Sequence, residues 1–523
     1  MSALATVATA DTVTTFDLPS INYYAIAPLL IMFGAAVVSV LVEAFVPRGG
    51  RRPTQLVLVL GSIAAAFAVT VDLRGTRLVT GEGALAVDGP TLLLWGSLLV
   101  VAFLAALTFA ERSIDPQGDA FAARASTLPG SDDEREFTNR GYLQTEVWPF
   151  LLFSITGMLA FIASNDLLMM FVALEVMSLP LYLLAGMARR RRLLSQEAAL
   201  KYFLLGAFSS AFFLFGVAML YGYSGSIGFV DIADALTGKP TETTLVLTGM
   251  ALLLVGLLFK VAAVPFHQWA PDVYQGAPTP VTGFMAAAVK IAAFGALLRL
   301  LYVGLGGMRW DWEAMLWIIA ALTMLVGVVV AITQTDIKRM LAYSSVAQAG
   351  FVLIGVLAAS PQGLASSIFY LIAYSFTTIG SFAIVSMVRD SSGEATHLSA
   401  WAGLGKRSPV VAAVFSLFMF SLAGIPLTSG FVAKFGVFAA ALAVDNVWIV
   451  VVGVIASIIA AFFYVRVIVL MYFAEPGPDT ASVVVPSAFT TIALTACAVM
   501  TIALGIFPQW LLDIIEQAGV FIR

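Results

Sequence analysis

The stretch GLLFKVAAVPFHQWAPDVYQGAP, residues 256–278, places a lysine and a proline inside a run of apolar residues. Lys260 is a charge in a segment that otherwise has the composition of a membrane-spanning helix. Pro265, five residues later, removes a backbone hydrogen bond from that helix. Because both features cost free energy in a bilayer, the combination predicts a broken transmembrane helix with a functional charge beside the break.

The composition of the whole chain is that of an integral membrane protein. Of the 523 residues, 60% are hydrophobic and only 11% are charged, and the mean hydropathy is +0.98. Soluble domains are roughly half apolar and a quarter charged. The apolar runs have the length of about 20 residues at which a helix crosses the hydrocarbon core. We therefore predict an all-α integral membrane fold.

About fourteen transmembrane helices are predicted from these runs. A polar tail (1–22) and a peripheral region with three helices and a loop (23–146) come first, and a final helix and tail (486–523) come last. Two five-helix groups (147–303 and 313–473) lie between them. The predicted spans are 23–46, 54–72, 91–110, 147–163, 166–187, 197–222, 245–268, 279–303, 313–333, 339–359, 363–388, 408–443, 446–473 and 486–508.

A second apolar run repeats the features of the first. Within FSLAGIPLTSGFVAKFGVFAAAL (420–442), Pro426 precedes Lys434, and Gly424 and Gly430 lie around the proline. Five helices separate the two runs, and an odd offset reverses the direction in which the chain crosses the membrane. This arrangement predicts that the two five-helix groups are inverted repeats, each with one broken helix.

Loop charges predict the orientation in the membrane. Sixteen lysines and arginines, Lys338 among them, fall in loops on one side of the predicted spans, and five fall on the other. The positive-inside rule then puts both termini on the outer side of a bacterial cell membrane. The four consecutive arginines 189–192 are the clearest cytoplasmic anchor. The polar segment 111–146 is predicted to be a cytoplasmic loop without a catalytic pattern.

Five charged residues lie inside the predicted spans, away from the span ends: Glu175, Lys201, Lys260, Lys290 and Lys434. At roughly 2.5 to 3.5 kcal/mol each, their isolated cost would rival the whole stability of a typical domain. One glutamate cannot neutralise four lysines, and both desolvation and like charge favour the neutral amine. Such lysines can release and rebind protons, so the set predicts proton transfer from Lys260 through Lys290 towards Lys434.

Three of the candidates have structural alternatives. Lys201 lies near the cytoplasmic end of its span, where it either joins the proton path or extends its amine to the interface. His267, close to Trp269, is either a residue of proton uptake or an interfacial hydrogen-bonding residue. Glu175 with one lysine also fits a buried ion pair that only holds helices together.

Redox cofactors have no ligand set in this chain. One cysteine, Cys497, and two histidines are too few for an iron–sulfur, haem or zinc site. The charged residues form no basic patch of the kind that binds nucleic acid. We expect no cofactor or metal in the chain itself, and a lipid bilayer around it.

Three segments resemble the antiporter-like membrane subunits of respiratory complex I. They occur in order and at family-like spacing: FKVAAVPFHQWAPDVYQGAPTPVTGFMAAAVKIAAFG (259–295), QTDIKRMLAYSSVAQAGFVLIG (334–355) and SLAGIPLTSGFVAKF (421–435). The resemblance covers about residues 21–510. It implies fourteen helices with two inverted five-helix bundles, each holding a half-channel.

The resemblance also implies roles by motif position. Glu175 and Lys260 would form the first pair, Lys290 the central link, and Lys434 the residue that faces the outer exit. Lys201 matches a further lysine of the family, in the motif EAALKY. Some members of the family usually carry a glutamate where this chain has Lys434. This difference, together with the end of the chain soon after the last span, points to one branch of the family.

The YSS segment is where the chain departs from many relatives. Tyr343 begins this segment, and Gln348 stands where many relatives have a histidine. Glutamine orients water but does not titrate, so a proton-carrying link at this position is in doubt. We take both residues as candidate supports of the proton path.

The resemblance implies a proton-pumping subunit of a bacterial NADH:quinone oxidoreductase, with no redox centre of its own. Its partners would be neighbouring antiporter-like and small membrane subunits. Flavin and iron–sulfur clusters would lie in partner subunits, with NADH and quinone as substrates of the whole complex. The alternatives are a subunit of a multi-subunit cation/proton antiporter or membrane-bound hydrogenase, and a mainly structural membrane scaffold.

Overall fold

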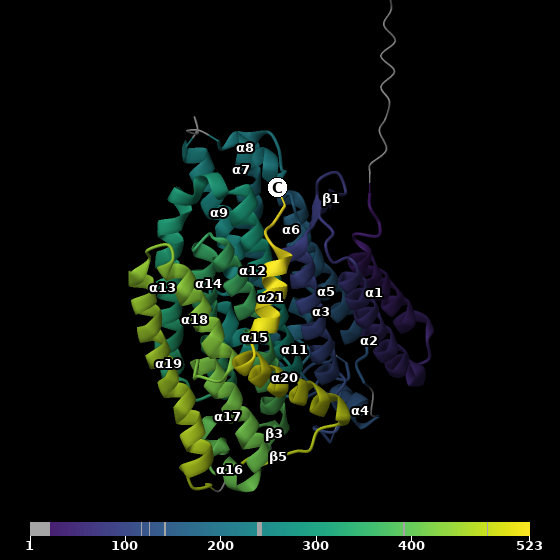
Figure 1. Ribbon diagram of the computed structural model, residues 1–523. Helices are drawn as coiled ribbons and strands as arrows, with labels where there is room; N and C mark the ends of the chain where they lie inside the picture. Colours follow the sequence, from purple (N-terminus) through teal and green to yellow (C-terminus); the bar gives the residue numbers. More distant parts are fainter. Residues whose placement is uncertain are drawn as a thin grey trace, which may run out of the picture.

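The computed structural model describes residues 21–116, 118–124, 126–140, 143–237, 243–390, 393–477 and 480–522. This part of the chain is mainly helical (Figure 1). Twelve of its helices are long and apolar enough to cross a membrane, and three shorter ones are also apolar. The predicted all-α membrane fold is confirmed. Of the predicted polar tail, residues 1–20 lie outside the described part.

The N-terminal helices lie at one side of the bundle, where α1 packs against α2 and α5 (Figure 1). A short antiparallel hairpin joins α2 to α3, pairing Leu78 with Val87. Helix α3 is far more buried than α1 and α2 because it packs against the central helices. The elements are α1 (Ala27–Phe45), α2 (Arg48–Asp72), β1 (Leu78–Thr80), β2 (Leu85–Val87), α3 (Gly89–Phe109) and α4 (Asp132–Asn139).

The first five-helix group begins with an antiparallel pair, α5 and α6, which is followed by the long helix α7 packed against α9. Its last crossing changes from α-helix to π-helix twice within one continuous segment. The elements are α5 (Val147–Ala163), α6 (Leu167–Ala185), α7 (Arg192–Ser224), α8 (Phe229–Ala235), α9 (Thr243–Val261), α10 (Trp269–Gly276), α11 (Thr279–Phe284), η1 (Met285–Val289), α12 (Lys290–Arg299) and η2 (Leu300–Gly304).

The second group places α13 against α14 and α19, and α15 against α18. Its elements, after η3 (Gly306–Met308), are α13 (Arg309–Thr333), α14 (Ile337–Leu357), α15 (Pro361–Met387), β3 (Val388–Asp390), β4 (Gly393–Glu394), η4 (Leu398–Trp401), α16 (Leu404–Arg407), α17 (Pro409–Ala423), α18 (Ser429–Leu442) and α19 (Val447–Phe473).

The C-terminal region after the second group contains β5 (Ser482–Val483), α20 (Ala488–Ile506) and α21 (Gln509–Ala518). Strand β5 joins β3 and β4 in a small antiparallel sheet at the end where α16 lies. Helix α20 packs against α15.

Two interruptions lie where the sequence places its proline–lysine pairs. Helix α9 ends at Val261 and α10 begins at Trp269, and the segment between them contains Pro265. Helix α17 ends at Ala423 and α18 begins at Ser429. Helix α9 starts at the end of the molecule where α8 lies, and α17 starts at the opposite end, beside α16 (Figure 1). The two interrupted crossings therefore run in opposite directions.

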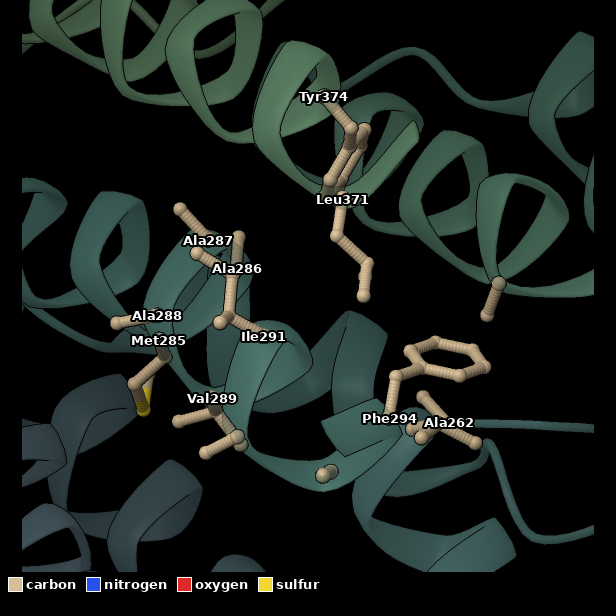
Figure 2. Close-up of a cluster of buried hydrophobic side chains, with 14 of the residues drawn as sticks. Ala262, Met285, Ala286, Ala287, Ala288, Val289, Ile291, Phe294, Leu371 and Tyr374 are labelled. Carbon is tan, nitrogen blue, oxygen red and sulfur yellow. The ribbon is translucent and has the colours of Figure 1, made fainter. Parts of the chain in front are cut away.

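The centre of the bundle is built from small and apolar side chains. In the most apolar stretch of the segment Thr279–Gly304, and in that of helix α15, every residue is buried. Figure 2 shows Ala286, Ala287 and Phe294 on this segment, with Leu371 and Tyr374 on the facing helix α15. This packing puts Lys290, which begins α12, at the centre of the molecule.

The segment 111–146 is tied to the rest of the chain by buried charges. Arg189 pairs with Asp119 at 2.8 Å, and Arg190 pairs with Asp115 at 2.7 Å. Burial raises the pKa of Asp119, and the charge of Arg189 opposes that shift. The arginine run that we took as a topological anchor therefore also holds this loop against the helices.

Two predictions from sequence need correction. Lys338 is not a loop residue: it lies in the first turn of α14 and is only 2% exposed. The predicted tail after the last span contains a further helix, α21, which packs against α3 and α15. The backbone N–H of Ile522 donates to Asp88, the carboxylate that also holds the buried Arg299.

Candidate functional site

Lys260, in the last turn of α9, is 3% exposed and lies beside the first interruption. Within the described residues its Nζ has no hydrogen-bond partner. The Nζ lies 5.5 Å from the ring centre of Tyr182 on α6 and 5.3 Å from that of Tyr202 on α7. Ring faces attract a cation, but a buried ammonium without hydrogen bonds is costly. The Lys260 amine is therefore held by ring faces alone among the described residues.

Lys290 is hydrogen-bonded to backbone oxygens from both repeats. Its Nζ donates to the carbonyl of Ser345 on α14 at 2.6 Å and to that of Val261, at the end of α9, at 3.3 Å. The ring of Tyr374 lies 5.7 Å away, and its hydroxyl donates to Ser345 Oγ. Because Val261 directly follows Lys260, the backbone at the end of α9 connects the helix that carries Lys260 to the Lys290 amine.

Polar contacts continue from α14 towards the second interruption. The hydroxyls of Ser344 and Tyr464 are hydrogen-bonded to each other. Gln348 Nε2 donates to Tyr464 Oη at 3.4 Å and to the carbonyl of Leu422 at 3.0 Å. The hydroxyl of Tyr370 donates to the Gln348 carbonyl oxygen. Gln348 is thus the point at which contacts from α14, α15, α17 and α19 meet.

Lys434 lies in α18, just after the second interruption, and is 5% exposed. Its Nζ donates to the carbonyls of Leu422 and Ala423 at 3.1 Å and 2.9 Å. It also lies 4.6 Å from the ring centre of Phe351. The last carbonyls of a helix have no partner within the helix, so the end of α17 supplies the acceptors that hold this lysine.

Two glycines give this interruption its shape. Gly424 has a φ of +83°, and a Cβ there would lie 2.8 Å from Lys434 Cδ. A Cβ on Gly430 would lie 1.8 Å from the backbone oxygen of Ser421. Pro426 lies in the exposed turn between the two helices. Gly424 is therefore required by its backbone conformation, and Gly430 by the close approach of the Ser421 backbone.

Glu175 and Lys201 lie outside this buried line. Glu175 on α6 is half-buried and accepts a hydrogen bond from Ser210, and no ion pair among the described residues joins it to a lysine. Lys201 is half-exposed and pairs with Asp272 at 2.7 Å. The structure therefore does not bring Glu175 and Lys260 into direct contact.

His267 and Tyr343 lie together near the first interruption, with ring centres 6.4 Å apart. His267 Nδ1 is buried and has no hydrogen-bond partner within the described part of the chain. Among the described residues, neither His267 nor Tyr343 forms a hydrogen bond with Lys260, Lys290 or Lys434. The geometry places both beside the path rather than in it.

Sequence reasoning missed several aromatic and charged residues of the site. Tyr182 and Tyr202 could not be told from ordinary packing aromatics by their spacing. Lys338 donates to the carbonyl of Ala277 at 2.8 Å and lies 3.7 Å from Glu394. It precedes Ser345 by seven residues, which puts both on one face of α14. That helical spacing was a signal that could have found Lys338.

Comparisons with known proteins agree with this geometry. Residues 164–460 match the family described as NADH:quinone oxidoreductase/Mrp antiporter, transmembrane. NADH-quinone oxidoreductase subunit N of Rhodococcus opacus is 59% identical over 528 residues, covering 97% of this chain and 98% of the relative. The chain belongs to the subunit N family of NADH-quinone oxidoreductase.

Solved structures of two membrane complexes contain chains that are similar to this one. A chain of respiratory complex I from Thermus thermophilus with bound aureothin is 32% identical, with a TM-score of 0.75, covering 93% of this chain and 98% of that one. A chain of the Mrp complex from Dietzia sp. DQ12-45-1b is 25% identical, with a TM-score of 0.78, covering 95% and 97%. The resemblance seen in the sequence, to an antiporter-like membrane subunit of complex I, is confirmed.

The described residues contain no group of three or more His, Cys, Asp or Glu that could hold a metal ion. Cys497 is buried in α20, where its hydrophobic surroundings account for it. The side chains that converge at the site are lysines, tyrosines, serines and a glutamine. Lysine amines can hold a proton, serine and tyrosine hydroxyls can both donate and accept hydrogen bonds, and a glutamine amide can orient its neighbours.

Proposed function

We propose that this chain carries protons across a bacterial cell membrane as a subunit of NADH:quinone oxidoreductase, along a line of buried lysines. Electron transfer from NADH to quinone, through flavin and iron–sulfur clusters in partner subunits, would supply the free energy. Moving one charge against 100 mV costs about 2.3 kcal/mol. The observation that carries the proposal is the line of buried polar groups from Lys290 to Lys434, in which Lys290 bonds Ser345 of α14 and contacts from the adjoining Ser344 lead through Tyr464 and Gln348 to the Leu422 carbonyl that holds Lys434.

The first transfer runs from Lys260 to Lys290. The polar atoms Lys260 Nζ, Tyr182 Oη and Tyr202 Oη are all buried, and none has a hydrogen-bond partner among the described residues. Buried polar groups are almost always bonded to protein or to ordered water. Water bound by these three atoms would take the proton from Lys260, and Lys290 beyond the Val261 carbonyl would accept it.

The second transfer runs from Lys290 to Lys434. A tyrosine or serine hydroxyl both donates and accepts hydrogen bonds, so Ser344 and Tyr464 would pass a proton without holding a charge, with bound water carrying it from Lys290 to Ser344 and from Tyr464 to Lys434. Gln348 does not titrate, and its amide orients its neighbours. Lys434 then receives the proton at the end of α17 and releases it towards the outer side.

Glu175 and Lys201 act at the margin of this path. A charge on Glu175 favours the protonated form of Lys260, so a partner that neutralises Glu175 would drive the proton onward. The ion pair between Lys201 and Asp272 favours the interfacial, anchoring role of Lys201. His267 lies on the same side of the path, where it supports proton uptake.

The two five-helix groups, 147–303 and 313–473, act as inverted repeats with one half-channel each. The opposite directions of α9 and α17 support this division. Both termini would lie on the outer side, which places the arginines 189–192 in the cytoplasm. The exposed turn at Ile425 and Leu427 interrupts a crossing, and irregular backbone is not tolerated against lipid. A neighbouring membrane subunit covers it in the assembled complex.

A second candidate function is cation/proton antiport, which the similarity to the Mrp complex favours. The identity to subunit N relatives is much higher and extends over nearly the whole chain. The two functions differ in their requirements, because an antiporter exchanges protons for a cation without electron transfer. Purification of the native assembly with flavin and iron–sulfur partners would decide for the oxidoreductase.

The decisive experiment replaces Lys260 with alanine, and separately Glu175 with alanine, in the assembled complex. Inverted membrane vesicles report proton uptake with a pH-sensitive dye while NADH oxidation is followed by absorbance. We expect most coupled pumping to be lost in both variants while the complex still assembles. Lys406→Ala, an exposed lysine, serves as the control. Normal pumping in both variants would leave only a scaffold role for the lysine line.

A further inference from the structure

A hollow of about 730 Å³ opens where the α1–α2 connection meets the segment 111–146. It shares no residue with the lysine path. Five arginines and two glutamates line it, which is a formal excess of three positive charges. A recess with such an excess concentrates anions. The arginines are Arg48, Arg51, Arg52, Arg112 and Arg124.

The glutamates of the hollow do not cancel this charge. Glu43 pairs with Arg51 at 3.5 Å and also accepts hydrogen bonds from Gln55 and Thr145, both at 2.7 Å. Glu146 accepts a hydrogen bond from Gln144 at 2.8 Å. The Glu43 carboxylate therefore already has three partners within the protein.

The remaining arginines face the hollow from two segments distant in sequence. Arg52 donates to the carbonyl of Ala110, and its guanidinium is repelled by Arg112 and attracted by Glu111 and Asp119. Arg48, Arg112 and Arg124 are exposed. Guanidinium groups form paired hydrogen bonds with phosphate oxygens. A phosphate between them would accept hydrogen bonds from arginines of both segments and offset their excess positive charge.

The neighbouring surface is apolar and belongs to membrane helices. Phe45, three residues before Arg48, is 80% exposed, and Val57, five residues after Arg52, is 74% exposed. In the most apolar stretch of α1 and in that of α2, only 33% of the residues are buried. The arginines thus lie at the end of a lipid-facing helix pair, at the level of the phosphate groups of a bilayer.

We propose that this hollow binds the phosphate headgroup of an anionic phospholipid, whose acyl chains lie against α1 and α2. A free phosphate ion shares the headgroup chemistry but not the apolar contacts. The bound lipid would join the α1–α2 connection to the segment 111–146. This site is independent of the proton path and of the proposed function.

The test uses the full chain in its purified native membrane assembly, stripped of loosely held lipid by detergent. Native mass spectrometry and fluorescence titration measure the binding of phosphatidylglycerol and phosphatidylcholine in mixed micelles, and of inorganic phosphate alone. The double variant Arg48→Gln/Arg112→Gln removes two lining charges. At about 1 kcal/mol per basic residue near a membrane, we expect phosphatidylglycerol affinity to fall about 30-fold.

The matched control is Arg135→Gln/Arg140→Gln, which removes two charges from exposed positions of the same segment that do not line the hollow. This control should bind phosphatidylglycerol within about twofold of the unchanged chain, and both double variants should assemble. Equal losses in the two double variants would indicate general surface attraction and overturn the site. Binding of inorganic phosphate as tight as that of phosphatidylglycerol would overturn the lipid assignment, and so would equal binding of phosphatidylcholine.

Discussion

The two helix interruptions resemble each other in sequence, but they treat their lysines differently. At the second interruption, Lys434 donates to two carbonyl oxygens at the end of α17. At the first, the Val261 carbonyl accepts from Lys290, whereas Lys260 has no hydrogen bond among the described residues. One lysine is held by its own interruption, and the other is left among tyrosine rings.

The order of lysine and proline along the chain explains this difference. Helical side chains point towards the N-terminus of their helix. Lys260 comes before its interruption, so its side chain points away from the carbonyls at the end of α9. Lys434 comes after its interruption, so its side chain points back to the end of α17. The same two elements therefore make one tightly held proton site and one weakly held proton site.

The largest effect is expected where the second interruption has no room to adjust. In Gly430→Ala, the new Cβ would meet the backbone oxygen of Ser421 at 1.8 Å. We expect a destabilisation of about 3 kcal/mol, the upper end of overpacking costs, and a loss of assembled complex in membranes. The control, Gly222→Ala, meets nothing within 4 Å and should assemble normally. Normal assembly of Gly430→Ala would show that the two helix ends are farther apart than described.

The next effect separates the two lysines directly. Both Lys434→Met and Lys260→Met should abolish most coupled pumping in inverted vesicles, since each removes a proton site. Only Lys434→Met leaves the Ala423 carbonyl without its donor, which costs about 2 kcal/mol. Thermal unfolding in detergent should therefore occur at a lower temperature for Lys434→Met than for Lys260→Met. Equal unfolding temperatures would remove the distinction between the two interruptions.

A smaller effect is expected at Gln348, the link between the two halves. Gln348→Leu removes the donor to Leu422 and the contacts with Tyr464 and Tyr370. The loss of about 1.4 kcal/mol in orienting contacts corresponds to about a tenfold fall in the pumping rate. Gln348→His, which keeps a hydrogen-bonding side chain, should retain most of the rate in the same vesicle measurement. A normal rate in Gln348→Leu would remove this residue from the path.

The smallest effect is expected at Lys201. Lys201→Gln breaks two partly exposed ion pairs, with Glu197 and Asp272. Such pairs contribute less than about 1 kcal/mol each, so unfolding temperature and pumping should change little. Glu197→Gln, which removes one of the same pairs, is the matched control. A pumping loss in Lys201→Gln as severe as in Lys260→Met would return Lys201 to the proton path.

Hydropathy alone predicted the crossings well, because each needs about 20 apolar residues wherever it lies in the bundle. Each predicted span overlaps a helix or an interrupted pair of helices. The charges Lys260, Lys290 and Lys434 could be found for the same reason, since a charge stands out in an apolar run. The helix ends around Pro265 and Pro426 followed from local backbone chemistry.

The contacts of those lysines could not be predicted, because they join residues far apart in sequence. Nothing local distinguishes Tyr182 and Tyr202, which face Lys260, from other aromatic residues of the spans. Lys338 looked like a loop charge because it lies beside Arg339 at a span boundary, but α14 turns it inwards against Ala277. The amphipathic helix α21 followed a proline and was too short to count as a crossing.

The sequence by itself determined the membrane environment, the positions of the buried charges and the opposite order of lysine and proline in the two interruptions. These depend on composition and on neighbours within a few residues. Only the tertiary structure decided which carbonyl each lysine meets and that Lys260 meets none. The physical reason is that a buried amine takes its partners from whichever helices pack around it, and that packing is set by the whole bundle.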